Sequence, residues 1–225
     1  MPILETRDLR KIYGAGDTEV RALDGVSLNV ERGEFVAVVG TSGSGKSTLL
    51  HMLGGLDRPT SGSVHVDGTD IFSLKDEALT IFRRRRIGFV FQSYNLMPVL
   101  SVRENILLPL QLDGAEPDEK YLGSIIAALG LEAKLNALPN QLSGGQQQRV
   151  AIARALASKP AILLADDPTG NLDSRTSQDV MGLLKLSAER FGQTIVMITH
   201  NEEIAQLADR IVRIEDGRIR GEARA

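Results

Sequence analysis

The sequence predicts an α/β protein with a mostly parallel sheet, antiparallel strands near the N-terminus and an inserted helical segment. Three apolar runs, residues 35–39, 161–165 and 194–199, have the length and β-branching of buried strands. Polar residues suited to phosphate or metal follow each run at once, as expected for a ligand site at the carboxyl ends of parallel strands. Helix formers dominate from residue 101 to about residue 140. These patterns indicate one α/β core interrupted by helices.

The composition limits the class of protein. The chain has 225 residues, no cysteine and a net charge of −3. We expect a single domain, with an α/β core (about residues 1–93 and 158–225) and a helical subdomain (about residues 94–157). The missing cysteines exclude a disulfide scaffold, and the charge gives no sign of nucleic-acid binding. Without a long apolar run or a signal-peptide core, we expect a chain that neither crosses a membrane nor is exported.

Two segments at the start of the chain alternate apolar and polar residues. Residues 3–13 and 20–30 have this pattern, most clearly from Val26 to Val30, and it predicts half-buried antiparallel strands. Tyr13 is the aromatic residue of this region. It either packs its ring on the core or offers a stacking platform to a nucleotide base, and the sequence favours neither interpretation.

The stretch from Gly40 to Ser47, here called the phosphate loop, has two glycines separated by four residues and followed by Lys and Ser. A predicted strand precedes it and a predicted helix (residues 48–53) follows it, which is the context this motif requires. Glycines let backbone N–H groups turn around a phosphate, and the positive end of the helix faces the same anion. Lys46 can reach the β- and γ-phosphates, and the Ser47 hydroxyl can bind Mg²⁺. The loop therefore predicts a nucleotide site.

Three further patterns lie between the phosphate loop and the helical segment. An Asp-Gly pair between alternating strands predicts a hairpin over residues 64–69. The basic run from Arg83 to Arg86 is typical of a solvated helix face and is too short to indicate nucleic acid. Residues 87–91 form another candidate buried strand, with Gln92 at its end. Gln92 either satisfies backbone groups of its loop or reaches a metal-bound water near the phosphates.

The helical segment contains one clear apolar face and a second candidate anion site. Residues 142–146, here called the signature segment, place Ser143 and two glycines at the start of a long helix. Free N–H groups and the helix dipole gather at such a point, although a plain N-cap would look the same. Four apolar residues lie near the start of the predicted helical subdomain, and they suggest packing in the core more than an interface with a partner. They are Leu96, Met97, Val99 and Leu100. The apolar helix face consists of Leu122, Ile125, Ile126 and Leu129.

Two acidic residues, Asp166 and Asp167, directly follow the second buried strand. Two adjacent carboxylates directly after an apolar strand cost free energy unless a cation lies near them. Pro168 allows the alternative of a turn or helix cap, but with a phosphate loop upstream we favour a Mg²⁺-linked acid beside a water-directing acid. His200 follows the third strand. We expect the phosphate loop, both aspartates and His200 to converge on one nucleotide.

Together these motifs resemble the nucleotide-binding subunit of an ABC transporter, over about residues 3–220. The signature segment is the most family-specific of them. The resemblance implies a core of the P-loop NTPase type, ATP and Mg²⁺ as ligands, and ATP hydrolysis that powers a separate membrane permease. It also implies ATP-dependent head-to-tail pairing of two chains, in which Ser143 and Gly145 of each chain act on the ATP of the other.

The resemblance also assigns roles to individual residues. Tyr13 matches the aromatic residue that stacks on adenine, and Gln92 matches the loop glutamine that touches Mg²⁺ and senses the membrane subunit. Asp166 matches the metal-linked acid, and His200 matches the switch histidine at the γ-phosphate. Asp173 belongs to a segment (residues 170–173) that crosses between subunits. The remaining implied nucleotide-binding residues are Gly40, Ser42, Gly43, Ser44, Gly45, Lys46, Ser47, Thr48, Ser143, Gly144, Gly145 and Gln146, of which Ser47 also binds the metal.

Residues 88–92, 104–109 and 168–173 resemble the branch that serves macrolide export, lipoprotein release and antimicrobial-peptide resistance. The implied cargo is a peptide, antibiotic or lipoprotein, and the implied location is the cytoplasmic face of the cell membrane. The family normally has Glu at the water-directing position where this chain has Asp167, which indicates slower hydrolysis. Either the substitution was introduced to slow the enzyme, or a native Asp works with a small backbone shift. We favour the first because the other motifs are intact.

Two other classes of function stay open. A soluble member of the same superfamily acting on DNA or ribosomes fits less well, because repair ATPases have longer insertions before the signature segment and translation factors have two cassettes. A nucleotide-binding regulator with little turnover is kept open by Asp167. We expect no nucleic-acid partner.

Overall fold

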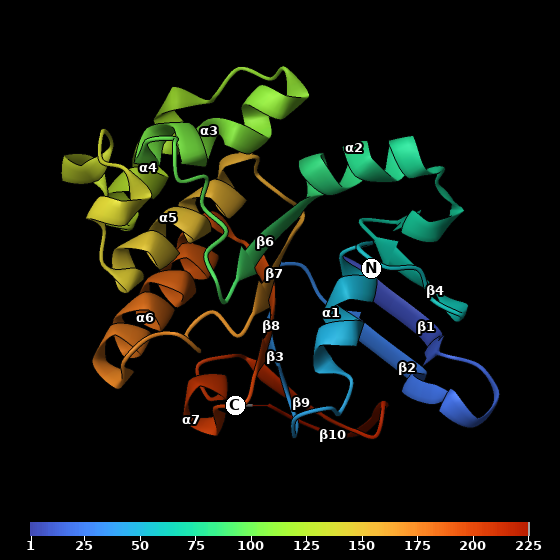
Figure 1. Cartoon of the computed structure of the whole chain (residues 1–225). Coiled ribbons are helices and arrows are strands. Elements are labelled where there is room, and N and C mark those ends of the chain that lie inside the picture. The colour runs from blue at the N-terminus through green and yellow to red at the C-terminus, as the bar shows by residue number, and fades with distance from the viewer. Residues whose placement is uncertain (225) are drawn as a thin grey trace.

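The computed structural model describes residues 1–224, which form two β-sheets and a group of helices (Figure 1). The smaller sheet is antiparallel, with strand order β2-β1-β4-β5. This arrangement confirms the two predicted N-terminal strands and the predicted Asp-Gly hairpin. Its strands are β1 (Leu4–Tyr13), β2 (Val20–Val30), β4 (Ser61–Val66) and β5 (Thr69–Asp70).

The larger sheet has six strands in the order β10-β9-β3-β8-β7-β6, and its pairs are parallel except for β9 and β10. In its centre, Ile198 on β8 pairs with Val38 on β3 and with Asp166 on β7. This register places the carboxyl ends of the three predicted buried strands side by side, as expected. The strands are β3 (Phe35–Val39), β6 (Ile87–Phe91), β7 (Ile162–Asp166), β8 (Thr194–Thr199), β9 (Arg210–Glu215) and β10 (Arg218–Arg224).

Strands β3, β7 and β8 of the larger sheet are buried on both faces, which explains their unbroken apolar runs. Along β3, Val36 and Val38 pack into the core between the two sheets, which also contains the buried face of α1 (Lys46–Leu53). Phe35, Ala37 and Val39 face the opposite core, against the helices. The phosphate-loop helix α1 therefore lies between the sheets, as Figure 1 shows.

Helices α3 (Val102–Asp113), α4 (Glu119–Ala128), α5 (Gly144–Ala157) and α6 (Ser174–Phe191) gather on one side of the larger sheet (Figure 1). All four residues of the predicted apolar face around α4 are buried. The remaining α-helices are α2 (Asp76–Arg86) and the short α7 (Glu202–Ala205). Within residues 1–224, we find no helix with the length and apolar character needed to cross a bilayer.

The four arginines at the end of α2 do more than face solvent. Arg84 and Arg85 both pair with Asp113 at the end of α3, at 3.0 and 2.8 Å, and Arg86 pairs with Asp67 in the β4–β5 turn. The prediction of a solvated face is therefore only partly right. The charges tie α2 to its neighbours, and they also lie favourably at the negative end of the helix.

The prediction of core packing is wrong for two residues of the loop between β6 and α3. Met97 and Val99 are 45% and 77% exposed, whereas Leu96 packs against the core. The loop is held instead by the buried Asn105, whose side-chain Oδ1 accepts from the Met97 N–H at 2.7 Å. The side-chain amide nitrogen of Asn105 donates to the main-chain oxygens of Met97 and Leu100. Because polar contacts fix the loop, its apolar side chains are free to point outward.

Candidate active site

The phosphate loop turns sharply between β3 and α1 and lies against other strands. Gly45 has φ 104°, and a Cβ there would lie 2.3 Å from the carbonyl oxygen of Ala22 on β2. A Cβ on Gly40 would lie 2.2 Å from the carbonyl oxygen of Ile214 on β9. Only glycine fits at either position. The neighbouring strands thus hold the loop in one shape.

The start of α1 is suited to an anion. Gly45 precedes the helix, so no side chain from that position caps the first turn, and that turn has no acidic residue. Its N–H groups are available to phosphate oxygens. The Lys46 ammonium lies in the same loop and donates to the main-chain oxygens of Gly40 at 2.8 Å and Thr41 at 2.7 Å. Burial lowers the pKa of Lys46, and Asp167 and Asp166 oppose that shift.

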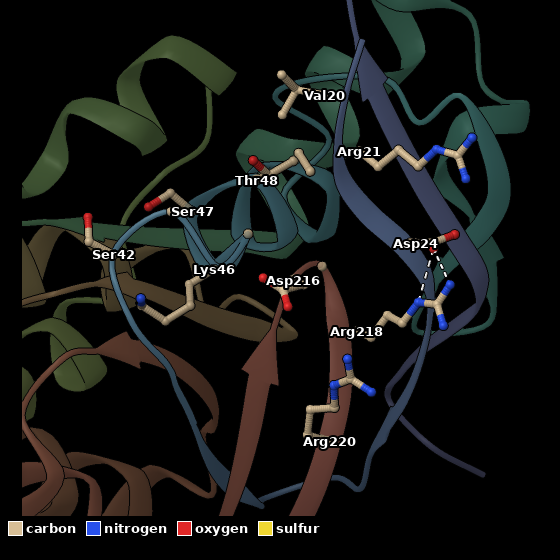
Figure 2. Close-up of a pocket in the computed structure, with 14 residues that line it drawn as sticks. Val20, Arg21, Asp24, Ser42, Lys46, Ser47, Thr48, Asp216, Arg218 and Arg220 are labelled. Carbon is tan, nitrogen blue, oxygen red and sulfur yellow. Dashed lines mark hydrogen bonds and ion pairs between the residues drawn. The ribbon is translucent and has the colours of Figure 1, made fainter.

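A cavity of about 710 Å³ opens beside the phosphate loop. Figure 2 shows Ser42, Lys46, Ser47 and Thr48 along one side of it. Val20 on β2 and the turn between β9 and β10 form other parts of the wall. The cavity therefore lies where the sequence predicts the nucleotide.

Asp166 ends β7 and is half-buried. Burial raises the pKa of its carboxyl, while the nearby His51 and Lys46 favour the charged form. Among residues 1–224 no cluster of three acidic, His or Cys side chains could hold a metal alone. Mg²⁺ commonly uses one or two protein oxygens together with substrate phosphates and water. The carboxylate of Asp166 and the hydroxyl of Ser47, next to a phosphate cradle, fit that donor set.

Asp167 and His200 meet at the ends of adjacent strands. The Asp167 Oδ2 atom lies 2.9 Å from His200 Nδ1, and the Thr199 hydroxyl donates to Asp167 Oδ1 at 3.2 Å. The Asp167 backbone is left-handed, with φ 42°, and its N–H donates to the Ile198 carbonyl at 2.9 Å. The two predicted catalytic side chains are therefore in direct contact.

Gln92 is joined to the segment that follows the acidic pair. The Gln92 side-chain amide donates to Asn171 Oδ1 at 3.1 Å. The Asn171 side-chain amide donates back to the main-chain oxygen of Gln92 at 3.0 Å. A Cβ on Gly170 would lie 2.6 Å from both Gln92 and Asp167. Gln92 and Asp167 thus flank one glycine. The sequence predicted roles for Gln92 and for residues 170–173, but nothing in it predicted the contact with Asn171.

The signature segment starts α5 as predicted. The Ser143 hydroxyl accepts from the Gln146 N–H at 3.3 Å, and the Gln146 side chain accepts from the Ser143 N–H at 3.0 Å. A Cβ on Gly145 would lie 2.4 Å from Thr176, which is bound by Asp173 at the start of α6. Among residues 1–224, the lining of the phosphate-loop cavity includes nothing from residues 142–146. Within one chain the two anion sites are therefore separate.

Tyr13 does not pack into the core, so that interpretation of it is wrong. The side chain is 42% exposed, and its hydroxyl donates to Asp57 Oδ2 at 2.9 Å. Tyr13 pairs across the sheet with Val20, which lines the cavity. Tyr13 therefore lies beside a residue of the cavity wall.

Comparison with known proteins decides the family. The family model described as ABC transporter matches residues 23–170, more than half of the chain. The chain belongs to the ABC transporter family. Family and relatives confirm the prediction of an ATP-hydrolysing, nucleotide-binding unit of an ABC transporter.

Relatives of this ABC ATPase lie in the predicted branch. It is 50% identical to the lipoprotein-releasing system ATP-binding protein LolD of Geobacter metallireducens, over 96% of this chain and 97% of that protein. It is 48% identical to the macrolide export ATP-binding/permease protein MacB of Syntrophobacter fumaroxidans, over 100% of this chain. The chain spans only 32% of that MacB protein.

The fold of this ABC ATPase is that of solved cassettes. The MJ0796 cassette of Methanocaldococcus jannaschii, a dimer in a post-hydrolysis state with ADP and Pi, superposes with a TM-score of 0.87. That structure is 45% identical to this chain, and the match covers 98% of both chains. The predicted fold class is thereby confirmed.

Proposed function

We propose that this ABC ATPase hydrolyses ATP with Mg²⁺ in a head-to-tail dimer and drives a membrane permease at the cytoplasmic face of the membrane. The cargo is a peptide, antibiotic or lipoprotein. The observation that carries the proposal is the separation of two anion-binding helix starts. The phosphate loop opens into one cavity, and the signature segment lies elsewhere in the same chain, against α6. A second copy would bring the two together around one ATP.

Each residue at the site then has a task. Lys46 leaves the loop carbonyls and binds the β- and γ-phosphates, and Tyr13 stacks on the adenine. Ser47, Asp166 and Gln92 would hold Mg²⁺, which supplies neutralisation of phosphate charge when bound. Asp167 orients the attacking water and accepts its proton. His200, now paired with Asp167, turns to the γ-phosphate.

The proposed dimer joins these residues to the signature segment of the second copy. The first turn of α5, beginning at Ser143 and Gly144, would present N–H groups to the γ-phosphate held by the other chain. Residues 170–173 would cross between the copies and report on closure to Gln92 through its contacts with Asn171. The dimeric MJ0796 cassette with ADP and Pi supports this assembly.

A groove between α2, β6, α3 and α5 is the proposed permease contact. It measures about 520 Å³, and its lining is largely apolar, with Phe89, Phe91 and Leu112 among its residues. Leu112 is 63% exposed, and the adjoining loop exposes Met97 and Val99. A short amphipathic helix from the permease fits such a surface, because its apolar face would cover these side chains. The name of the MacB relative, an ATP-binding/permease protein, supports a partner of this kind. The name of the LolD relative, an ATP-binding protein of a lipoprotein-releasing system, supports the same kind of partner.

The dimer is tested at Ser143. Replacing it by Arg should leave ATP binding intact, because the phosphate loop is unchanged, but should prevent pairing and hydrolysis by placing a bulky cation at the start of α5. The measurements are ATP affinity, oligomeric state with and without ATP, and turnover per chain as protein concentration rises. Lys46→Ala is the matched control, which should lose most ATP affinity with the fold intact. Unchanged turnover in Ser143→Arg would mean that the cassette works as a monomer.

A further inference from the structure

We infer that Asp57 and Lys11 are positioning residues that hold the Tyr13 ring for the base of a bound nucleotide. The inference rests on the proposed stacking role of Tyr13. It assigns a function to the loop after α1, to which the sequence patterns gave none. The three side chains form one hydrogen-bonded group next to Val20, which lines the phosphate-loop cavity.

Asp57 is the centre of this group. Its Oδ2 accepts from the Tyr13 hydroxyl at 2.9 Å, and its Oδ1 accepts from the Lys11 ammonium at 2.8 Å. The Arg58 N–H also donates to Oδ1 at 2.7 Å, and Lys11 donates to the Arg58 carbonyl at 2.7 Å. Both oxygens of the carboxylate are thus occupied. The geometry fixes the phenol at its far end, so the ring has little freedom to rotate.

Lys11 acts on the face of the ring as well as on Asp57. Lys11 and Tyr13 are two residues apart on β1, and both side chains donate to Asp57. The Lys11 ammonium lies 4.9 Å from the centroid of the Tyr13 ring, within the range of a cation–π contact. The ring nevertheless stays 42% exposed. The cation supports the ring on one side, and the exposed part is available to a flat ligand.

The same group connects the base platform to the phosphate loop. Asp57 lies in the loop that leaves the end of α1, and Thr48 in the first turn of α1 lines the phosphate-loop cavity. Burial and the bond to Asp57 raise the pKa of Tyr13, which keeps its hydroxyl protonated as a donor. Helix α1 therefore carries a phosphate site at its start and a support for the base platform at its end. The ligand that uses both is a nucleoside triphosphate with an aromatic base.

The test compares two ligands of the full chain in the presence of Mg²⁺: ATP, and inorganic tripolyphosphate, which has no base. Tyr13→Ala should weaken ATP binding about tenfold, as expected for the loss of one stacked base. Asp57→Ala should weaken ATP binding about three- to fivefold. Asp57→Asn should weaken ATP binding less than Asp57→Ala does, because it keeps a neutral acceptor for the phenol. Tripolyphosphate affinity should stay unchanged in all three variants. Asp57→Ala in a Tyr13→Ala background should cause no further loss, since both act on one contact.

Asp76→Asn is the matched control. Asp76 is an exposed residue that pairs with Arg58, the neighbour of Asp57, at 2.7 Å, and this variant should bind both ligands normally. If Asp57→Ala binds ATP as the parent does while Tyr13→Ala does not, the inference is overturned and the proposed function stands. Equal losses for ATP and tripolyphosphate would also overturn it, because Asp57 would then act on the phosphate loop. Unchanged ATP binding in Tyr13→Ala would remove the proposed base site itself.

Discussion

At the scale of single residues, we expect Asp167 to limit the rate at which this ATPase hydrolyses ATP. Its carboxylate contacts His200 and Thr199, and it is one methylene shorter than the Glu that the family normally places there. The missing bond withdraws the carboxylate by about 1.5 Å. Misplacing a catalytic group by about 1 Å can cost on the order of 10²-fold in rate. The proposed phosphate and metal contacts involve Lys46, Ser47 and Asp166, so ground-state binding should suffer less.

We therefore expect Asp167→Glu to raise steady-state ATP hydrolysis at least tenfold and to change ATP affinity little. Turnover and nucleotide titration on the two proteins side by side would measure both effects. Asp167→Asn serves as the control, because it keeps the length and removes the base, and it should be slower than the parent. Equal rates for Asp and Glu would show that the left-handed backbone at residue 167 already places the carboxylate well.

We expect Asp166, the proposed metal-linked acid, to lower the stability of the nucleotide-free chain. Burial raises the pKa of this carboxyl, so its charged form opposes folding above that pKa, and the cost disappears as the pH falls through it. Asp166→Asn removes the charge. At neutral pH the variant should melt at a higher temperature than the parent without nucleotide, and the difference should shrink in acidic buffer.

The same variant should lose activity. Without the Asp166 carboxylate the proposed metal site keeps only neutral oxygen donors, and we expect ATP hydrolysis to fall by about 10²-fold or more. Thermal melts over a pH series, together with turnover at saturating Mg²⁺, test the two effects on one sample. Asp76→Asn, at an exposed carboxylate, should change neither. A lower melting temperature for Asp166→Asn at neutral pH would contradict the assignment of an uncompensated charge.

At the scale of elements, one buried side chain holds the loop that joins the nucleotide site to the proposed permease groove. Asn105 on α3 is fully buried and bonds the backbone of Met97, Leu100 and Ser101. Arg154 on α5 donates to the carbonyl oxygen of Tyr94, at the other end of the loop. The segment after Gln92 is thereby fixed between α3 and α5 although it has no regular structure.

Asn105→Ala should lower the free energy of unfolding by about 2 kcal/mol, because it leaves several buried backbone groups without partners. Denaturant unfolding of the nucleotide-free chain measures this loss. Asn29→Ala, at an exposed position on β2, is the control and should change stability little. An unchanged free energy of unfolding in Asn105→Ala would mean that the loop finds other hydrogen-bond partners. Arg154 and neighbouring contacts would then be enough to hold the loop.

At the scale of the whole molecule, the apolar loop and the β4–β5 turn belong to different parts of the fold. The loop carrying Met97 and Val99 leaves β6 beside the helices, whereas the turn at Gly68 belongs to the smaller sheet (Figure 1). A permease that docks on the proposed groove should touch the loop with Met97 and Val99 and should not touch the turn at Gly68. The chain has no cysteine, so a single introduced thiol is unique.

Cysteine at position 97 or 99 should therefore crosslink to an integral membrane protein in membranes that contain the permease. Cysteine at position 68 is the control and should give no such product. Detection is by a mass shift of the tagged chain and identification of the captured partner. Crosslinks that form only from position 68 would place the permease at the smaller sheet and refute the proposed groove.

Strand positions, the phosphate loop and the start of α5 can be read from the sequence because their signals are local. An unbroken apolar run such as residues 194–199 has few alternatives once both faces of a strand are buried, and glycine spacing around Lys46 is a property of one short segment. Convergence of the three strand ends follows from a general rule of parallel sheets. The family resemblance then adds roles that no local pattern contains.

Contacts between distant segments depended on the tertiary structure. Tyr13 and Asp57 are 44 residues apart, and Gln92 and Asn171 are 79 apart; neither pair has a sequence signal, because each depends on how elements from separate segments pack. Met97 and Val99 were expected in the core on hydrophobicity alone. The buried hydrogen bonds of Asn105, formed only when α3 and its preceding loop pack together, decide that these two side chains face outward.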